Sequence, residues 1–255
     1  MSAAQIRFSS LVRREVNRFF KIKRQTLGAP LLETFLYISV FGAALGSRID
    51  ELHGIDYVVF IIPGLIMMAW AINAFANNAS SILQQKFQRA IDDQLSSPAS
   101  PFELLVAFSL GGFLRGMIVA TLTFGAASLL VDLPVEHVLV LLPALFLVGF
   151  FFALLGVLVG VRAEQFDDVS FAQTFVLQPL IFLGGVFYSA ALLPEPFQTL
   201  THFNPVYYMI GLVRYGFLGY SEANVALSLA VLTAATLALL AVNLRLFARG
   251  YRLRA

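Results

Sequence analysis

The sequence has no cysteine among its 255 residues, and only 13% of its residues are charged. The absence of cysteine excludes a disulfide framework and any zinc or redox site built on thiolates. Soluble domains carry about 25% charged residues, whereas 59% of this chain is hydrophobic and its mean hydropathy is +0.82. Such a chain could not cover its surface with polar groups in water. It is therefore predicted to lie largely in lipid.

Lysine and histidine are also scarce, which limits the chemistry available to the chain. None of the three lysines follows a glycine, so the Gly-Lys-Ser/Thr sequence of a nucleotide-binding P-loop is absent. The histidines are far apart along the chain, at His53, His137 and His202, and form no His-Glu-x-x-His motif. We therefore expect no catalytic residue, no metal ligand and no enzymatic activity in the chain itself.

Apolar residues dominate the chain and gather in six runs. The runs cover residues 31–46, 57–79, 102–130, 138–161, 171–193 and 225–247. A helix needs about 17–25 mainly apolar residues to cross a bilayer, and all six runs are near or above this length, the first being the shortest. The predicted fold class is all-α, a polytopic membrane protein with six transmembrane helices.

Basic residues are distributed unevenly between the two sides of this topology. Of the 17 Lys and Arg residues, seven precede the first run and two lie between the second and third. One more lies between the fourth and fifth runs, and four lie at the C-terminal end, of which Arg245 is the first. These fourteen are on one side, so the positive-inside rule places both termini in the cytoplasm.

The first 29 residues are predicted to form an N-terminal interfacial amphipathic helix, which precedes a transmembrane domain over residues 30–255. Its apolar residues are Phe8, Leu11, Val12, Val16, Phe19 and Phe20, and its basic residues are Arg7, Arg13, Arg14, Arg18, Lys21 and Arg24. On a helical wheel the two sets lie on opposite sides, and the basic side is expected to face anionic headgroups. A signal peptide would place its apolar core earlier and end at small residues.

The polar segment between the second and third runs has a narrow apolar stripe. Phe87, Ile91 and Leu95 recur every fourth residue, which predicts one amphipathic helix over residues 86–97. Two interpretations are equally compatible with the sequence. The helix packs on its own bundle as part of a solvated loop, or it docks into a groove on a cytoplasmic partner.

Residues 194–218 are too apolar for an ordinary loop, and three prolines divide them into pieces too short to span a bilayer. Short apolar helices at membrane depth must be buried in protein or line a cavity. We expect two short re-entrant or interfacial helices here, joined at Asn204–Pro205.

Two sets of charged or polar residues near the runs have competing interpretations. Arg115 would cost about 2.5–3.5 kcal/mol at mid-bilayer, so it either contacts a substrate or gate, or, as we favour, pairs with another helix. Asp167 and Asp168 precede the fifth run and most simply cap a helix rather than bind metal. Ser100, Pro101 and Glu103 form a capping box that starts the third run.

Several segments together resemble the ABC-2 type permeases of bacterial ABC exporters. Residues 95–101 are similar to the family's coupling region, and residues 178–189, Leu193–Pro194, Asn204–Pro205 and residues 211–216 are similar to its C-terminal signature. The resemblance covers nearly the whole chain and is closest to small bacterial inner-membrane permeases. As an ordered set these motifs are specific, whereas each alone is weak.

The resemblance implies a multi-pass permease in the bacterial inner (cytoplasmic) membrane that moves an amphiphilic substrate outward by alternating access. The implied partners are two copies of a cytoplasmic ATPase subunit, a second permease copy and membrane lipid, without nucleic acid. This chain would bind no cofactor, because ATP and Mg would be held by the partner. The implied coupling residues are Phe87, Arg89, Ile91, Asp92 and Leu95. The implied substrate pathway or gate contains Arg115, Phe187, Tyr188, Asn204, Tyr208 and Arg214.

Two other functions are compatible with a multispan chain. A prenyl or lipid transferase could hold magnesium pyrophosphate at Asp167 and Asp168, but it would need a second acidic cluster. The other cytoplasmic pair, Asp92 and Asp93, lacks the spaced repeat of such enzymes. An ATP-independent carrier or channel would differ by transport that survives ATP depletion.

Overall fold

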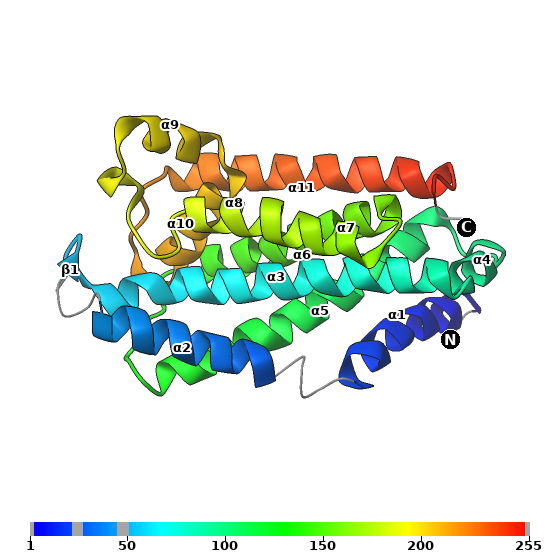
Figure 1. The fold of residues 1–255 in the computed structure, drawn as a ribbon, viewed down its shortest axis with the longest axis horizontal. Helices are drawn as coiled ribbons and strands as arrows, with labels where there is room; N and C mark the ends of the chain where they lie inside the picture. Colours follow the sequence, from blue (N-terminus) through cyan, green and yellow to red (C-terminus); the bar gives the residue numbers. More distant parts are fainter. Residues whose placement is uncertain (1–2, 22–27, 45–50, 253–255) are drawn as a thin grey trace.

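The computed structural model describes residues 3–21, 28–44 and 51–252, and the described chain is almost entirely helical (Figure 1). In chain order the helices are α1 (Ala3–Lys21), α2 (Ala29–Ala44), α3 (Tyr57–Phe87), α4 (Ala90–Leu95), α5 (Pro101–Ser128), α6 (Val138–Arg162), α7 (Phe166–Phe171), the π-helical turn η2 (Ala172–Leu177), α8 (Gln178–Leu183), the 3₁₀ turn η3 (Ala190–Leu192), α9 (Glu195–Phe203), α10 (Pro205–Leu218) and α11 (Val225–Ala248). A two-residue antiparallel hairpin, β1 (Glu51–Leu52) with β2 (Ile55–Asp56), precedes α3.

Four of these helices, α3, α5, α6 and α11, are long and apolar enough to cross a membrane. The prediction of an all-α polytopic membrane protein is therefore confirmed. The helices run alongside one another (Figure 1), which defines two ends of the bundle. We call them the α4 end, where both termini and α4 lie, and the hairpin end, where β1 and α9 lie.

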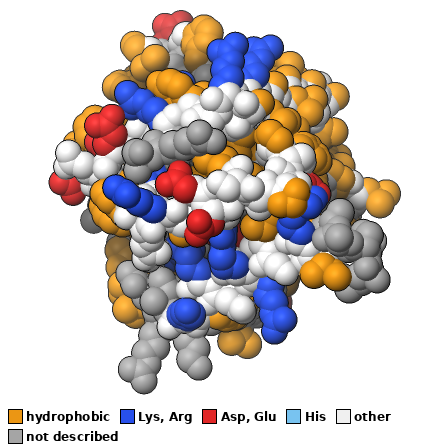
Figure 2. All heavy atoms as spheres, turned by 90° about the vertical axis from the view of Figure 1, so that its right-hand side faces the viewer, with side chains coloured by type: hydrophobic (Ala, Val, Ile, Leu, Met, Phe, Trp, Pro, Cys, Tyr) orange, Lys and Arg blue, Asp and Glu red, His pale blue; other side chains and the backbone are white. Residues whose placement is uncertain are grey.

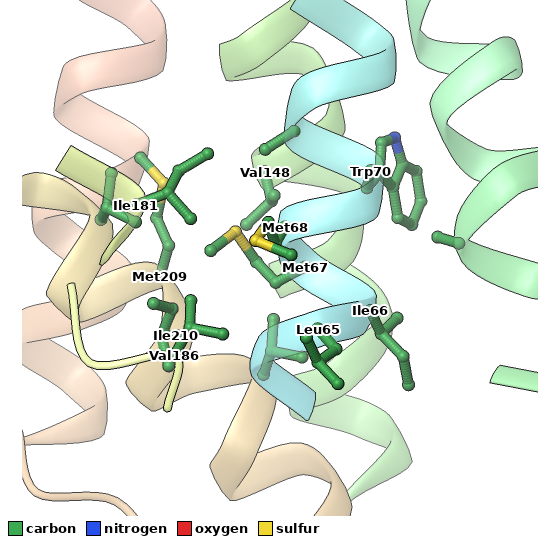
Figure 3. Packing of buried hydrophobic residues seen from close by; sticks show 14 of the residues in the cluster. Leu65, Ile66, Met67, Met68, Trp70, Val148, Ile181, Val186, Met209 and Ile210 are labelled. Carbon is green, nitrogen blue, oxygen red and sulfur yellow. The ribbon is translucent and has the colours of Figure 1, made fainter. Parts of the chain in front are cut away.

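The central helix is α3, which packs between α5 and α6. Close approach depends on glycine: a Cβ on Gly112 would lie 2.6 Å from the Ala74 carbonyl oxygen, and one on Gly156 would overlap the Phe75 carbonyl. In Figure 3, Met67 and Met68 of α3 point toward Met209, whereas Trp70 points to the opposite side. Apolar side chains of α3 thus fill the core on both sides of the helix.

Three helix boundaries differ from the predicted runs. The second run continues as α3 to Phe87 rather than ending near residue 79. The fifth run forms a helix earlier than expected, from Phe166 to Leu183 through α7, η2 and α8. It ends before residue 193 because the chain turns at Gly184–Gly185, where Gly185 has φ +88°.

The segment before the last helix contains the two short helices that the sequence predicts. α9 and α10 meet at Asn204–Pro205, where the Asn204 side chain accepts a hydrogen bond from the Val206 amide at 3.0 Å. Pro205 occupies the first position of α10, where its missing N–H costs nothing. α10 is mostly buried, whereas Phe197, Leu200 and Phe203 of α9 are exposed.

Candidate functional site

The predicted coupling segment is divided by a turn. Lys86 and Phe87 are the last residues of α3, the chain reverses at Gln88–Arg89, and α4 follows. Lys86 Nζ donates to the carbonyls of Val161 (3.0 Å) and Ala163 (2.7 Å). These contacts extend α3 by anchoring its last turn to the end of α6. The prediction of one helix over residues 86–97 is therefore wrong, because a tertiary contact decides where α3 ends.

The apolar stripe of that segment does not face in one direction. Phe87 is 59% exposed and stacks on Phe166, whose ring centroid lies 5.6 Å away and which is 52% exposed. Ile91 is only 1% exposed and packs with Leu104 and Leu105 of α5, and Leu95 is half-buried. Ile91 is therefore a core residue and cannot contact a partner directly.

Charged side chains lie around this exposed pair. Arg89 and Asp93 are exposed and Asp92 is half-buried, while Glu164 of the α6–α7 loop pairs with Arg252 at 3.2 Å. Figure 2, which looks onto the α4 end, shows basic and acidic side chains gathered there beside hydrophobic ones. The end surface thus combines two exposed aromatic rings with charges of both signs.

Asp168, one of the two acidic residues in the first turn of α7, caps that helix. One oxygen of Asp168, Oδ2, accepts hydrogen bonds from the backbone amides of Glu164 (2.8 Å) and Gln165 (3.0 Å). Asp168 therefore has the capping role predicted from its position. Ser100 and Glu103 likewise form the predicted capping box at the start of α5.

A buried carboxylate joins α1 to the bundle, and it was not singled out from the sequence. Glu15 is 1% exposed and accepts hydrogen bonds from Ser81 Oγ (2.6 Å) and Gln85 Nε2 (3.0 Å) of α3. Gln94 of α4 donates to the Gln85 side-chain oxygen and accepts from Arg14 at 2.9 Å. α1, α3 and α4 are thus connected by one polar network. The only signal in the sequence is that Glu15 is the sole acid in a basic segment.

The orientation of α1 differs from the prediction that its basic side faces headgroups. Arg7 donates to both carboxylate oxygens of Glu103 at 3.0 Å, and Arg18 donates to the Asn77 carbonyl (2.6 Å) and side-chain oxygen (2.8 Å). Phe20, from the predicted apolar side, is 45% exposed. The difference arises because acceptors on α3 and α5 satisfy these guanidinium groups inside the bundle.

Arg115 lacks the internal partner that we favoured from the sequence. No hydrogen bond or ion pair joins it to any described residue, and its buried Nε has no acceptor. The charge that acts on it is that of Arg18, which repels it. The described residues therefore supply no partner for the favoured interpretation of Arg115, an internal ion pair or a hydrogen bond to another helix, which stays a prediction.

Arg214, near the hairpin end, is fully engaged. It is 3% exposed, donates to the Gly185 carbonyl at 2.8 Å and lies over the Phe60 ring, 3.8 Å from its centroid. Glu222 lies 4.0 Å away and in turn accepts from the Ala190 amide. Arg214 thus fixes the Gly185–Ala190 turn against α3.

The other predicted pathway residues are also engaged within the fold. Phe187 stacks on Phe41, with centroids 4.4 Å apart, and Tyr188 is half-buried in the same turn. Asn204 donates to the Leu180 carbonyl, and the Tyr208 hydroxyl donates to the His202 carbonyl at 2.9 Å. Phe187, Tyr188 and Arg214 are thus neighbours, Asn204 and Tyr208 lie at the α9–α10 junction, and Arg115 is elsewhere, beside Arg18.

Comparison with known proteins places the chain in a family. Residues 6–218 match the model of the ABC-2 type transporter. The chain is 41% identical over 249 residues to the inner membrane transport permease YadH of Escherichia coli (strain K12). The alignment covers 98% of this chain and 97% of that protein. It is 28% identical over 206 residues to nodulation protein J of Rhizobium leguminosarum bv. viciae, covering 79% and 78%. The chain therefore belongs to the ABC-2 type transporter family, whose member YadH is named an inner membrane transport permease.

Proposed function

We propose that the chain is the transmembrane permease subunit of an ABC exporter in the bacterial inner membrane. It moves an amphiphilic substrate outward by alternating access, and a separate ATPase subunit supplies the energy. The substrate is a lipid, a lipid-linked glycan or a hydrophobic drug. The observation that carries the proposal is that the α4 end presents an exposed aromatic pair on an anchored turn, in a member of this family that has no P-loop.

The proposed topology has six spans, with the α4 end in the cytoplasm. α2 supplies one further span and the continuous helix through α7, η2 and α8 supplies the other. Both present large apolar side chains outward, such as Phe35 of α2 and Phe175 of η2. α9 and α10 re-enter from the outer side. The distribution of basic residues supports this orientation.

The absence of native cysteine makes the orientation directly testable. A single Ser96→Cys substitution places a thiol beside α4, and Glu51→Cys places one in the hairpin; both positions are exposed. In intact cells a membrane-impermeant maleimide is expected to label only the Glu51→Cys protein. Labelling of Ser96→Cys from outside the cell would overturn the orientation.

We propose that two ATPase subunits bind a pair of permease copies at their α4 ends. Phe87, Arg89, Asp92, Asp93 and Phe166 form the contact surface, and ATP and Mg remain on the partner. Ile91, Leu95 and Gln94 serve this surface indirectly, because they hold α4 against α3 and α5. A push on α4 is thereby transmitted to the bundle rather than absorbed by a loose loop.

The experiment is co-purification with a candidate ABC ATPase subunit from the same organism, together with a measurement of its ATPase activity. Phe87→Asp is expected to lower the association at least about tenfold, since a buried aromatic anchor commonly contributes 2 kcal/mol or more. Phe203→Asp, at a still more exposed aromatic position (82%) at the hairpin end, is the control and leaves association unchanged. Unchanged association of Phe87→Asp, or transport that survives ATP depletion, would overturn the proposal.

A further inference from the structure

We propose that Arg18 and Arg115 form a binding site for the anionic head group of an amphiphile, held at the inner edge of the hydrocarbon region. The ligand class is a phosphate or similar anion attached to an apolar tail. The depth and direction of the site rest on the proposed topology. The pairing of the two arginines rests on the packing of α1 against α5.

The register of α1 on α5 brings the two arginines together. Arg7 bonds Glu103, and a Cβ on Gly111 would lie 2.7 Å from the Glu15 Cβ. The two helices therefore run parallel, since the contact positions advance together along both. About one turn farther along the two helices, the same register brings Arg18 of α1 to the level of Arg115 of α5. Their charges repel each other.

α2 contacts α5 farther along the helix. The hydroxyl oxygens of Thr34 and Thr123 lie 3.4 Å apart, whereas the register of α1 on α5 puts the last turn of α1 beside Arg115. Figure 1 shows α1 and α2 following one another beside α5. Arg115 therefore lies on α5 near the end of the stretch that α1 covers and before the stretch that α2 covers, and it is half-buried there.

The depth of the site follows from α3. Residues 57–76 are apolar except for Asn73, and a helix of this length spans about 30 Å, the thickness of the hydrocarbon core. The polar residues that follow, beginning at Asn77, mark the inner boundary. Arg18 bonds Asn77, so its guanidinium lies at this boundary, where phospholipid phosphates are found.

Arg115 lies only slightly deeper. Its neighbours Gly112 and Gly116 pack against Ala74 and Trp70 of α3, which places its Cα about one to two turns inside the Asn77 level. A long arginine side chain can reach back to the interface across that distance. Both guanidinium groups can therefore meet one anion at headgroup depth.

The local charge favours an anion. Arg14 and Arg18 both pair with Glu15, and Glu15 also accepts hydrogen bonds from Ser81 and Gln85. Arg115 has no acidic partner among the described residues, although an unpaired charge at this depth is costly. Guanidinium groups bind phosphate in a bidentate manner, so one phosphate would relieve both the repulsion and the missing partner.

The tail would lie along α5. Ile118 and Leu122 follow Arg115 by three and seven residues, so they share its side of the helix. Both are half-buried rather than enclosed in the core. An acyl chain extending from a phosphate at Arg115 would contact them while pointing toward the centre of the bilayer.

The test is lipid retention by the purified permease, measured by native mass spectrometry after reconstitution in phosphatidylcholine with phosphatidylglycerol. The wild type is expected to retain phosphatidylglycerol. The Arg115→Gln and Arg18→Gln proteins are each expected to retain about tenfold less of it, because a charge-assisted contact is lost. Arg115→Lys retains an intermediate amount. Arg13→Gln, at an exposed position of α1, is the matched control and retains it fully. Equal loss in Arg13→Gln, or none in Arg115→Gln, overturns the site.

A second experiment with two possible outcomes identifies the source of the anion. Proteoliposomes that contain the permease, the ATPase subunit and a fluorescent anionic phospholipid are used to measure ATP-dependent movement of this lipid to the outer leaflet. Movement that Arg115→Gln abolishes identifies the site as part of the transport pathway. Retention without movement identifies a resident lipid of the inner leaflet. Retention is measured without the ATPase, so a failure of ATPase association would overturn the exporter proposal and leave this one standing.

Discussion

Arg214 and Arg115 both lie on apolar helices, but the chain around them is built differently. Arg214 has a carbonyl, an aromatic face and a carboxylate within the fold. Among the described residues, Arg115 has only the repulsion of Arg18 and a buried Nε without an acceptor. A charge that a fold needs for its own stability is surrounded by its own partners. The charge of Arg115 would gain its partner from the anion that we propose to bind there.

The same contrast separates the two ends of the bundle. At the hairpin end, Arg214, Glu222 and the Gly185–Ala190 turn form a closed set of contacts. At the α4 end, Ile91 and Gln94 are anchored while Phe87 and Arg89 face outward. The first region stabilises the molecule, and the second combines an anchored base with an exposed surface.

The largest expected effect is the loss of the Arg214 contacts. Arg214→Gln is expected to lower the free energy of unfolding by about 3–5 kcal/mol, because Glu222 would be left as a buried charge without its partner. Arg115→Gln should leave it unchanged or raise it slightly. Thermal unfolding in detergent measures both. Equal destabilisation by the two substitutions would remove the distinction between them.

The second effect concerns the two apolar residues of the predicted coupling stripe. Ile91→Ala is expected to cost about 2–4 kcal/mol of stability by leaving a cavity, whereas Phe87→Ala should cost little. Binding of the ATPase subunit should show the reverse order for protein that is still folded. Chemical denaturation and co-purification of the same samples check this. A stable Ile91→Ala protein that no longer binds the ATPase would return Ile91 to the docking surface.

Hydropathy and capping rules predicted much of this fold, since they depend on neighbours in the chain. The four long helices, the capping box at Ser100 and the junction at Asn204 were all predicted in this way. The sequence did not show that α3 continues to Phe87, because a bond from Lys86 to the end of α6 decides it. It also did not show which side of α1 faces the bundle, because Glu15 and Asn77 become neighbours of that helix only after folding.

The candidate site was less predictable than the fold for the same reason. Arg214 and Arg115 are similar in sequence context, each a single arginine in an apolar segment, and we assigned both to a pathway. Their difference lies in distant residues: Glu222 and Phe60 for one, Arg18 for the other. The Gly184–Gly185 pair was a local signal that the helix ends before residue 193. The predicted fifth run, which extended to residue 193, did not take it into account.

The polar network of α1 provides a third, smaller effect. Glu15→Gln removes the charge that Arg14 and Arg18 share and is expected to cost about 1–3 kcal/mol, as for a buried group left unsatisfied. It should also weaken the coupling of ATPase activity to substrate, since Gln85 and Gln94 depend on this carboxylate for their orientation. Glu195→Gln, at an exposed acid of α9, serves as control. Equal stability of the two variants would show that α1 is held by its apolar contacts alone.

The smallest effect tests why an arginine occupies the turn before α4. Arg89 has φ +55°, a left-handed conformation that favours glycine and costs other residues about 1 kcal/mol. Arg89→Gly is therefore expected to raise the free energy of unfolding by about 0.5–1 kcal/mol while lowering ATPase binding severalfold. This opposite change would show that the side chain is kept for its contact with the partner despite its backbone strain. If the glycine variant is more stable and binds equally well, Arg89 lies outside the contact surface, which then rests on Phe87 and Phe166.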